Sequence, residues 1–394
     1  MLARKLREEE IRDAVRIAKV CFHGRVEKPE DLEPGPWELN AAQWAAFTDE
    51  GRMMGRMQNN HFRAYFDGAI VENGGIGGVA TLPEYRESGA VREIFTKLLP
   101  DAREKGEVIS TLYPFSHAFY RKFGYETVVH QNVYEMTPDV LREYRFNGTA
   151  ELYHPGRPVT AFTKLYNEFA AGRNLAFFRD DPYMEKEWLS DDPYQKRCFS
   201  YLLSENGEPV SYVIFQDIRH DPQAILHVEE AVFRNREGFL AILGFLGRFS
   251  ADYGTIRLPL PTDIDLLSVI HSPKSYEIKK TPKQDYMIRV INAEKLLSLI
   301  RMPEGERFVI RVEDELLPEN TGTYRVTGGK SGNLVEPSDS DADIRVSERA
   351  LGQIACGAAS LTEAALRTDV EIFGKEELLR RVFCRKPLYI MDHF

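Results

Sequence analysis

The residues from Val79 to Val91 combine a strand end, a proline and a glycine turn that could bind an anion. Pro83 has no N–H to give to a sheet ladder, so a strand that reaches it must end there. Arg86 and Gly89 then form an R-x-x-G turn, in which the glycine lets the backbone approach a bound group and the arginine supplies positive charge. A helix that begins at this turn adds its positive end. The segment therefore favours the binding of a diphosphate by main-chain amides.

The elements around this turn are predicted to alternate between strand and helix. Ile76–Val79 predicts a strand whose glycines suit a bulge, and after the turn apolar residues recur at helical spacing from Val91 to Leu99. Glu107–Tyr113 predicts a second strand, rich in β-branched residues, and Ser116–Tyr125 a short helix that ends at a glycine. The expected order is strand, phosphate turn, helix, strand and short helix.

Two motifs in these elements resemble those of the Gcn5-related N-acetyltransferase (GNAT) superfamily. The R-x-x-G turn is similar to the acyl-CoA motif Q/R-x-x-G-x-G/A and departs from it only at the last position, where Val91 replaces a small residue. The run Phe119–Tyr125 resembles the F-Y-x-x-F-G-Y pattern of these enzymes, and more narrowly of the enhanced intracellular survival (Eis) family. The resemblance implies acetyl-CoA as cosubstrate and an amine as acceptor. We expect no metal, because the histidines and cysteines lack the spacing of metal ligands.

The resemblance also implies which residues bind acetyl-CoA. The pantetheine arm would lie beside the backbone of Val79, Ala80 and Thr81, as an added strand on a splayed sheet edge. The diphosphate would bind the amides of the turn, and a segment after the second strand would line the far side of the CoA arm. The turn residues are Glu87, Ser88, Gly89, Ala90, Val91 and Arg92, and those of the second segment are Phe115 and Ser116.

Attack of an amine on a thioester requires two proton transfers. Tyr120 matches the family's general acid, because a phenol of pKa ~10 is protonated at neutral pH and can donate to a leaving thiolate, whose conjugate acid has a pKa of ~8.5 by analogy with cysteine. Judged without the family match, Tyr120 is a packing residue. His117 lies three residues earlier, so it could face the same side of a helical turn and act as acid or shuttle instead.

In the Eis family the chain's terminal carboxylate is the base, and here that group belongs to Phe394. The tail Pro387–Phe394 is apolar where most chain ends are polar, so we expect it to pack inward; a final strand with aromatic packing is the alternative. Transfer of a proton from an ammonium of pKa ~9 to an α-carboxyl of pKa ~3.5 is unfavourable by about 7 kcal/mol. Burial must therefore shift one of these pKa values, or the proton must leave through ordered water.

The length of 394 residues predicts two or three domains, since single cores seldom exceed ~250 residues. Residues 1–145 carry the two motifs and end after a strand at Asn132–Met136. Residues 146–285 repeat the strand-turn-helix order with Arg234–Gly238 in place of the phosphate turn. Because the spacing there is altered, we interpret this region as a degenerate GNAT fold without cofactor. A second active site is the alternative.

Residues 286–394 predict a different order of strands and helices from that of the two preceding regions. Strands are predicted at Asp285–Ile291, Arg307–Val312 and Thr323–Val326, with a hairpin turn at Thr327–Asn333 and a helix at Ser347–Thr362. The Eis family carries a sterol-carrier-like domain at this position, and the pattern is similar. The predicted fold class is therefore α+β (mixed α/β), with tandem GNAT folds, active then degenerate, and a C-terminal sterol-carrier-protein-like α/β domain.

The composition limits the kinds of binding partner and the cellular location that we expect. The formal net charge of −10 argues against nucleic-acid binding, which needs clustered Lys and Arg, and leaves cationic substrates open. No run of ~18 apolar residues and no apolar signal region are present, so we expect a cytoplasmic protein without membrane association. The four cysteines are far apart, so we expect free thiols and neither disulfides nor a zinc site; they are Cys21, Cys198, Cys356 and Cys384.

These observations predict an acetyl-CoA-dependent N-acetyltransferase that acts on an amine of a cationic small molecule. Aminoglycoside-like or polyamine-like acceptors are implied by the resemblance, as is a homohexamer. One alternative is acetylation of a protein lysine or N-terminus, which would need an open peptide groove. The other is a carrier or binding module for an apolar ligand in the C-terminal domain.

Overall fold

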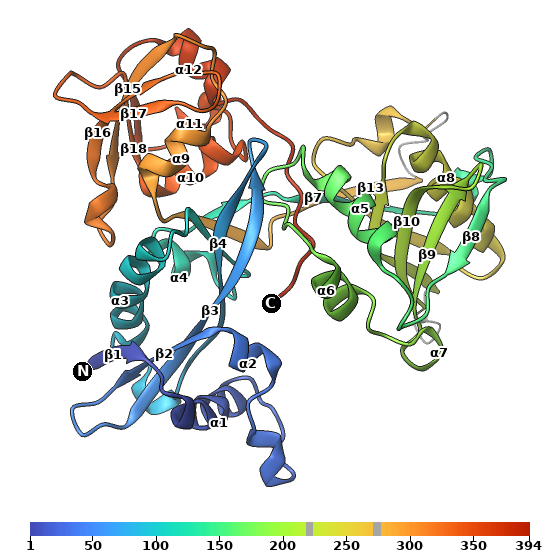
Figure 1. Ribbon diagram of the computed structural model, residues 1–394, viewed down its shortest axis with the longest axis horizontal. Helices are drawn as coiled ribbons and strands as arrows, with labels where there is room; N and C mark the ends of the chain where they lie inside the picture. Colours follow the sequence, from blue (N-terminus) through green and yellow to red (C-terminus); the bar gives the residue numbers. More distant parts are fainter. Residues whose placement is uncertain (218–223, 271–276) are drawn as a thin grey trace. The chain divides into compact units, whose positions relative to one another are not determined.

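The computed structural model describes residues 1–217, 224–270 and 277–394, and the chain divides into two compact units. Figure 1 labels the helices and strands. Unit 1 comprises residues 1–128, 285–385 and 393–394, and unit 2 comprises residues 129–284 and 386–392. Within the described ranges, no helix combines the length and the apolar character needed to cross a membrane.

The first part of unit 1 is a seven-stranded sheet in the order β1-β2-β3-β4-β5-β14-β6. Strands β4 and β5 are parallel neighbours, and the other pairs of this sheet are antiparallel. The strands are β1 (Leu2–Lys5), β2 (Ala42–Phe47), β3 (Met53–Phe66), β4 (Ala69–Thr81), β5 (Ile109–Leu112), β6 (Glu126–Val128) and β14 (Tyr286–Val290), and the helices are α1 (Ile11–Cys21), α2 (Pro36–Asn40), α3 (Ala90–Glu104) and α4 (His117–Arg121).

Helix α3 packs against this sheet through the apolar stripe that its sequence predicts. Ile94, Phe95, Leu98 and Leu99 are buried in one core cluster together with residues of β2, β3 and β4. The repeat of these residues at three- and four-residue spacing places them on one side of the helix. The strand, helix, strand and short-helix order predicted after residue 76 is confirmed, although β5 is shorter than the predicted Glu107–Tyr113 strand.

Two strands pair differently from the prediction. We expected β7 (Gln131–Met136) to end the first region, but it pairs with β12 and β13 in the sheet of unit 2. We expected the strand at Asp285–Ile291 to open the C-terminal region, but β14 lies between β5 and β6 in the first sheet. Both strands are half or fully buried and rich in apolar residues, so local sequence pattern does not specify which sheet they join.

The second part of unit 1 is a five-stranded sheet in the order β17-β16-β15-β18-β19 with four helices. The predicted turn at Thr327–Asn333 does join an antiparallel pair, β16 and β17. The predicted helix at Ser347–Thr362 is shorter, because Gly357 at φ +83° ends it. The elements are β15 (Arg307–Glu313), β16 (Gly322–Thr327), β17 (Leu334–Pro337), β18 (Ile344–Ser347), β19 (Val370–Ile372), α9 (Ala293–Leu299), α10 (Glu348–Cys356), α11 (Leu361–Ala364) and α12 (Glu376–Val382).

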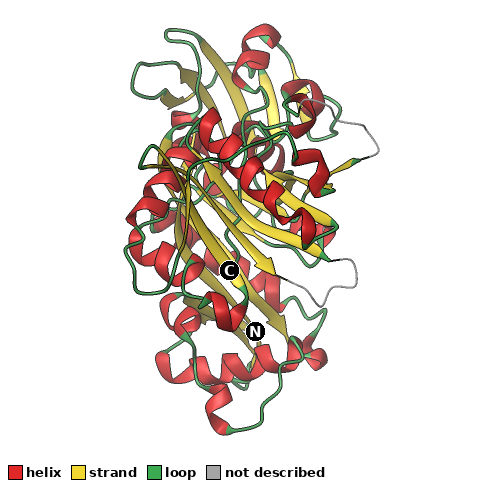
Figure 2. Ribbon diagram, turned by 90° about the vertical axis from the view of Figure 1, so that its right-hand side faces the viewer, coloured by secondary structure: helices red, strands yellow, loops and turns green. Residues whose placement is uncertain are grey.

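Unit 2 is built around another seven-stranded sheet, in the order β13-β7-β12-β11-β10-β9-β8, in which β11 and β12 run parallel. Figure 2 shows helices in red along the yellow strands. The remaining strands are β8 (Thr149–Leu152), β9 (Cys198–Glu205), β10 (Glu208–Asp217), β11 (Ile225–Phe233), β12 (Thr255–Leu260) and β13 (Ile278–Lys283), and the helices are α5 (Thr160–Ala170), α6 (Asp181–Tyr183), α7 (Pro193–Lys196) and α8 (Arg236–Leu246).

A buried ionic network lies inside unit 2. The Arg179 guanidinium is fully buried and pairs with Glu230 and Asp392, each at 2.9 Å. Its Cζ atom lies 3.6 Å from the ring centroid of Tyr166 and 3.9 Å from that of Trp188. Because every charge in this network has a partner of opposite sign, the network can be buried without an isolated ion. It holds residues 386–392 within unit 2.

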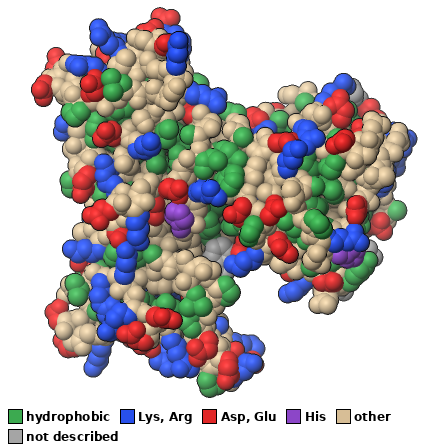
Figure 3. Space-filling model, viewed as in Figure 1, with side chains coloured by type: hydrophobic (Ala, Val, Ile, Leu, Met, Phe, Trp, Pro, Cys, Tyr) green, Lys and Arg blue, Asp and Glu red, His purple; other side chains and the backbone are tan. Residues whose placement is uncertain are grey.

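Acidic and basic side chains alternate over the visible face of each unit in the space-filling view (Figure 3). This mixture agrees with the composition of 51 Lys and Arg against 61 Asp and Glu. Exposed ion pairs, such as those of Arg16 with Asp13 and of Arg380 with Glu376, join acidic and basic side chains across single helical turns. Pairs of this kind contribute little to stability, since water and salt screen them.

Candidate active site

A cavity of about 740 Å³ opens in unit 1. Its size falls in the range of small-molecule sites. Four segments line it: the end of α1, the end of β4, the turn into α3, and the loop and helix α4 that follow β5. The lining residues are Cys21, Phe22, Val79, Ala80, Thr81, Tyr85, Arg86, Glu87, Gly89, Ala90, Val91, Arg92, Phe115, Phe119, Lys122 and Phe123.

One wall of the cavity is the open edge of β4. The parallel ladder of β4 with β5 ends at the pair Ile76 and Leu112, while β4 continues to Thr81. On the side of β5, the last five residues of β4 therefore have no partner among the described strands. An extended ligand can hydrogen-bond such an edge as an added strand.

A bulge bends β4 at the start of this edge. The register with β3 shifts between Arg56 and Gln58, which face Ala80 and Gly77 respectively. Gly78 lies inside the shift at φ +55°, a left-handed conformation that glycine adopts without strain. The glycines of this strand thus provide the bulge that the sequence predicts.

The turn between β4 and α3 forms the second wall. Gly89 is the N-cap residue of α3 at φ +88°, and its residue type supplies no side-chain cap for the helix. The first-turn amides of this 15-residue helix remain available to an anion, and the helix dipole favours negative charge at the same point. Arg86, Arg92 and Lys122 also line the cavity, against a single acidic lining residue, Glu87. The site is suited to an anionic group.

The predicted cofactor residues gather around this one cavity, with two exceptions. Ser88 and Ser116 do not line it. Ser116 instead caps α4, since its side chain accepts a hydrogen bond from the Phe119 amide at 3.3 Å. A serine suits this position because its side chain can cap the N-terminus of the short helix α4.

Several lining residues were not predicted from the sequence. Phe119, Lys122 and Phe123 belong to the F-Y-x-x-F-G-Y run, so the motif itself carried the signal for them. No sequence signal pointed to Cys21: it is the last residue of the amphipathic helix α1, and only the fold brings its Sγ within 3.3 Å of the Thr81 carbonyl. Burial raises the pKa of this thiol, so it stays protonated at neutral pH.

Tyr120, the predicted acid, is buried on α4 and is 3% exposed. Its ring packs edge-on against Phe115 and Phe119, with centroids 5.4 and 5.2 Å away. Both neighbours line the cavity, whereas Tyr120 does not. Burial raises the pKa of the Tyr120 hydroxyl above its ordinary value, because the phenolate would lose its solvation. The phenol is therefore protonated throughout the neutral range.

Phe394, the predicted base residue, packs within unit 1. Its ring centroid lies 4.9 Å from that of Phe62 on β3 and 6.0 Å from that of Tyr113. Tyr113 and Phe115 belong to the same short loop after β5, and Phe115 contacts Tyr120. One loop thus contacts the rings of both residues predicted to be catalytic. The described residues contain no group of three or more His, Cys, Asp or Glu side chains arranged to hold a metal.

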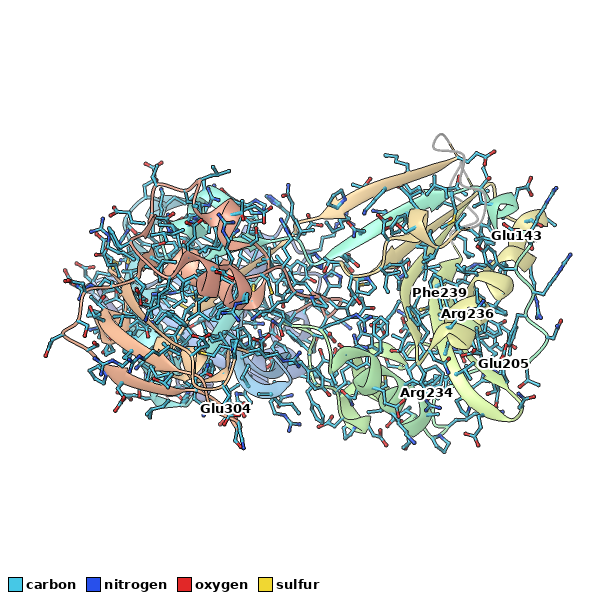
Figure 4. All side chains as sticks on the ribbon, turned by 90° about the horizontal axis from the view of Figure 1, so that it is seen from above. Glu143, Glu205, Arg234, Arg236, Phe239 and Glu304 are labelled. Atoms are coloured by element: carbon cyan, nitrogen blue, oxygen red, sulfur yellow. The ribbon has the colours of Figure 1, made fainter. Side chains whose placement is uncertain are left out.

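The corresponding helix of unit 2 begins differently. At the start of α8, the Asn235 side chain accepts a hydrogen bond from the Gly238 amide at 3.1 Å, and Arg234 pairs with Glu168 at 2.7 Å. Figure 4 labels Arg234, Arg236 and Phe239 at this end of α8. A Cβ at Gly238 would lie 2.3 Å from the Val210 carbonyl oxygen. The chain's own groups therefore occupy the space and the amide that an anion would need there.

Comparison with known families gives three matches along the chain. Residues 3–128 match one family described as an acetyltransferase (GNAT) domain, and residues 175–290 match another with the same description. Residues 293–390 match a sterol carrier protein domain. The match at residues 3–128 contains the cavity-lining residues described above.

Two proteins of Streptomyces avermitilis, each described as an uncharacterized N-acetyltransferase, are similar in sequence. One is 23% identical over 75% of this chain and 74% of its own length, and the other is 22% identical over 83% and 84%. Among solved structures, a GCN5-related N-acetyltransferase from Anabaena variabilis superposes with a TM-score of 0.86 at 20% identity, covering 100% of this chain and 99% of its own.

Eis1 from Mycobacterium abscessus superposes with a TM-score of 0.80 at 20% identity, and the match covers 100% of both chains. At this identity the likeness concerns the fold. The family matches and the curated relatives add the class of activity. The chain therefore contains two acetyltransferase (GNAT) domains followed by a sterol carrier protein domain, shares the fold of Eis1, and is an acyltransferase.

Proposed function

We propose that this chain transfers the acetyl group of acetyl-CoA to an amine of a cationic small molecule, aminoglycoside-like or polyamine-like, at the cavity of unit 1. The observation that carries the proposal is the junction of an open strand edge with an uncapped helix start around one cavity. The open strand edge can bind an extended arm, and the uncapped helix start can bind a diphosphate. Acetyl-CoA has both groups.

The lining fits acetyl-CoA in this orientation. The pantetheine arm would bind along Val79–Thr81, and the diphosphate would bind the turn residues Glu87–Arg92. The basic side chains of the lining would neutralise phosphate charge. Phe115 would cover the far side of the arm. Ser88 would take part through the backbone of the turn. Ser116 would take part by capping α4, the helix that carries Tyr120.

In the proposed reaction the amine nitrogen attacks the thioester carbonyl carbon and the C–S bond breaks. Tyr120 gives its hydroxyl proton to the leaving thiolate, and the terminal carboxylate of Phe394 accepts the proton that the amine loses. The raised pKa of Tyr120 holds the phenol in its protonated form at neutral pH and also makes it a weaker acid toward the thiolate. The aromatic contacts of Phe394 support the second role, because they fix the last residue beside β3.

The division into an active domain (1–145), a degenerate domain (146–285) and a carrier-like domain (286–394) remains part of the proposal, except that β7 joins the sheet of the second domain and β14 the sheet of the first. The capped start of α8 supports a single acetyl-CoA site. The acceptor class rests on the resemblance and on the net charge of −10, which favours cations. A homohexamer is proposed from the resemblance, and a cytoplasmic location from the lack of an apolar run of ~18 residues in the sequence. Acetylation of a protein amine and a carrier role in the C-terminal domain are the competing functions.

The exchange of Gly89 for alanine is expected to weaken acetyl-CoA binding by at least about tenfold, because a Cβ in left-handed backbone would distort the amides of the turn. Isothermal titration calorimetry measures this affinity. Gly106 offers a matched control, since it also has φ +88° and lies after α3, away from the cavity lining. Both variants should lose about 1 kcal/mol of stability. Equal acetyl-CoA affinity in the two variants would contradict the assignment of the turn.

A further inference from the structure

Arg56 on β3 is a buried cation that lacks a carboxylate partner. It is 1% exposed, and within the part of the chain that the structure describes it forms no ion pair. Its Nη2 atom donates to Gln43 Oε1 at 2.9 Å and to Gln58 Oε1 at 2.6 Å, both neutral groups. Its Nε atom has no hydrogen-bond partner among the described residues.

The other two fully buried arginines among the described residues are different. Arg179 pairs with Glu230 and Asp392, and Arg289 pairs with Asp314 at 2.9 Å. Burial of a charge without a counterion is costly, and folded proteins normally avoid it. The acidic group that acts on Arg56 is Glu38, from a distance longer than an ion pair, and burial lowers the pKa of the guanidinium. Arginine remains protonated at neutral pH in proteins, so the charge persists.

The guanidinium lies against the bulge of β4. A Cβ built at Gly78 would lie 2.8 Å from Nη2 and 3.0 Å from Cζ of Arg56, so a side chain at this position would displace the guanidinium from where it now lies. Gly78 immediately precedes Val79, the first residue of β4 that lines the cavity. The uncompensated charge therefore lies beside Gly78, on the β3 side of the strand whose open edge is proposed to bind the acetyl-CoA arm.

We propose that Arg56 is a positioning residue for acetyl transfer, which supports the bulge of β4 and holds positive potential behind it where the thioester oxygen gains negative charge. This inference rests on the proposed function. When the amine attacks, the C=O π electrons move onto oxygen, and they return when the C–S bond breaks. A preorganised charge in a low-dielectric site favours the charged transition state over the neutral thioester. A carboxylate partner would cancel that potential, which gives a reason for its absence.

The first variants are Arg56→Met and Arg56→Lys. We expect Arg56→Met to lower kcat by about 10- to 100-fold while the acetyl-CoA Kd stays within about threefold of the parent value, because the thioester ground state is neutral. We expect Arg56→Lys to recover only part of kcat, because burial without a carboxylate partner lowers the pKa of lysine and favours its neutral form. Steady-state kinetics and calorimetry give the two constants, and thermal unfolding reports whether each variant is folded.

A second variant separates charge from structure. Gln43→Glu places a carboxylate at the atom that now bonds Nη2, so it compensates Arg56 without removing it. We expect this variant to keep its Tm or raise it and to lose kcat by a similar factor of about 10 to 100, because paired charges have little external potential.

If the role of Arg56 is only structural, Gln43→Glu will keep the parent kcat, and that result would overturn the inference. The outcome is readable even if Arg56→Met fails to fold. Absence of acetyl-CoA binding by the unmodified chain would instead refute the proposed function. Calorimetry on the parent protein therefore distinguishes the two failures.

Discussion

Tyr120→Phe is expected to lower kcat for acetyl transfer by about 10²- to 10⁴-fold, the usual contribution of a general acid, with little change in acetyl-CoA affinity. Phenylalanine keeps the ring contacts with Phe115 and Phe119 and removes only the hydroxyl. The thiolate would then have to leave without a proton from the protein. Steady-state assays of thiol release measure kcat, and calorimetry measures the Kd of acetyl-CoA.

The pH dependence provides a second readout for Tyr120. Because burial raises the pKa of Tyr120, the acid form persists through the pH range in which an unperturbed phenol would begin to ionise at ~10. We therefore expect no descending limb in kcat below pH ~10 from this group. A limb near pH ~8 to ~9 that disappears in Tyr120→Phe would show a lowered pKa and contradict this account of the acid.

Tyr125→Phe is the matched control for Tyr120→Phe. Tyr125 lies in the same sequence run, is fully buried, and hydrogen-bonds Ser110 through its hydroxyl at 2.7 Å. Its loss should cost about 1 kcal/mol of stability and change kcat only slightly. Equal kcat losses in the two variants would mean that both tyrosines act through packing.

Extension of the chain by two glycines after Phe394 should lower kcat by about 100-fold or more, because the carboxylate proposed as base becomes an amide. The Phe394 ring would still contact Phe62 and Tyr113, so the fold should be retained. Thermal unfolding checks the fold, and the rate of acetyl transfer at saturating acetyl-CoA checks the base.

Phe394→Leu is the companion variant, because it removes the aromatic contacts and leaves the terminal carboxylate. We expect it to lose less than about tenfold in kcat. If the extended chain retains full activity, the terminal carboxylate is not the base. If Phe394→Leu is as inactive as the extension, the contacts of the ring and not the carboxylate explain the effect.

The sequence predicted the parts of the site that local physics determines. The apolar spacing of α3, the proline that ends β4 and the glycine at the N-cap of α3 each leave a signal within a few residues. The structure brings these segments to one cavity, and the residues predicted from the motif surround it except for Ser88 and Ser116.

The sequence did not predict features that depend on pairing over long distances. Both β7 and β14 pair with strands more than 100 residues away in the chain, β7 with β12 and β13, and β14 with β5 and β6. No turn sets the register of such strands, so the periodicity gives their type but not their sheet. Arg56 was missed for a related reason: an arginine within a strand looks exposed until the burial of its neighbours is known.

The most direct test of the account is thiol release from acetyl-CoA by the purified chain, with panels of cationic amines, lysine-containing peptides and no acceptor, and with mass spectrometry of the products. We expect rapid release only with cationic small amines, together with acetylated amine. The carrier alternative predicts copurified lipid and no acetyl-CoA affinity. Absence of release with every acceptor, together with no heat of acetyl-CoA binding, would contradict the account; release with peptides alone would contradict the proposed acceptor.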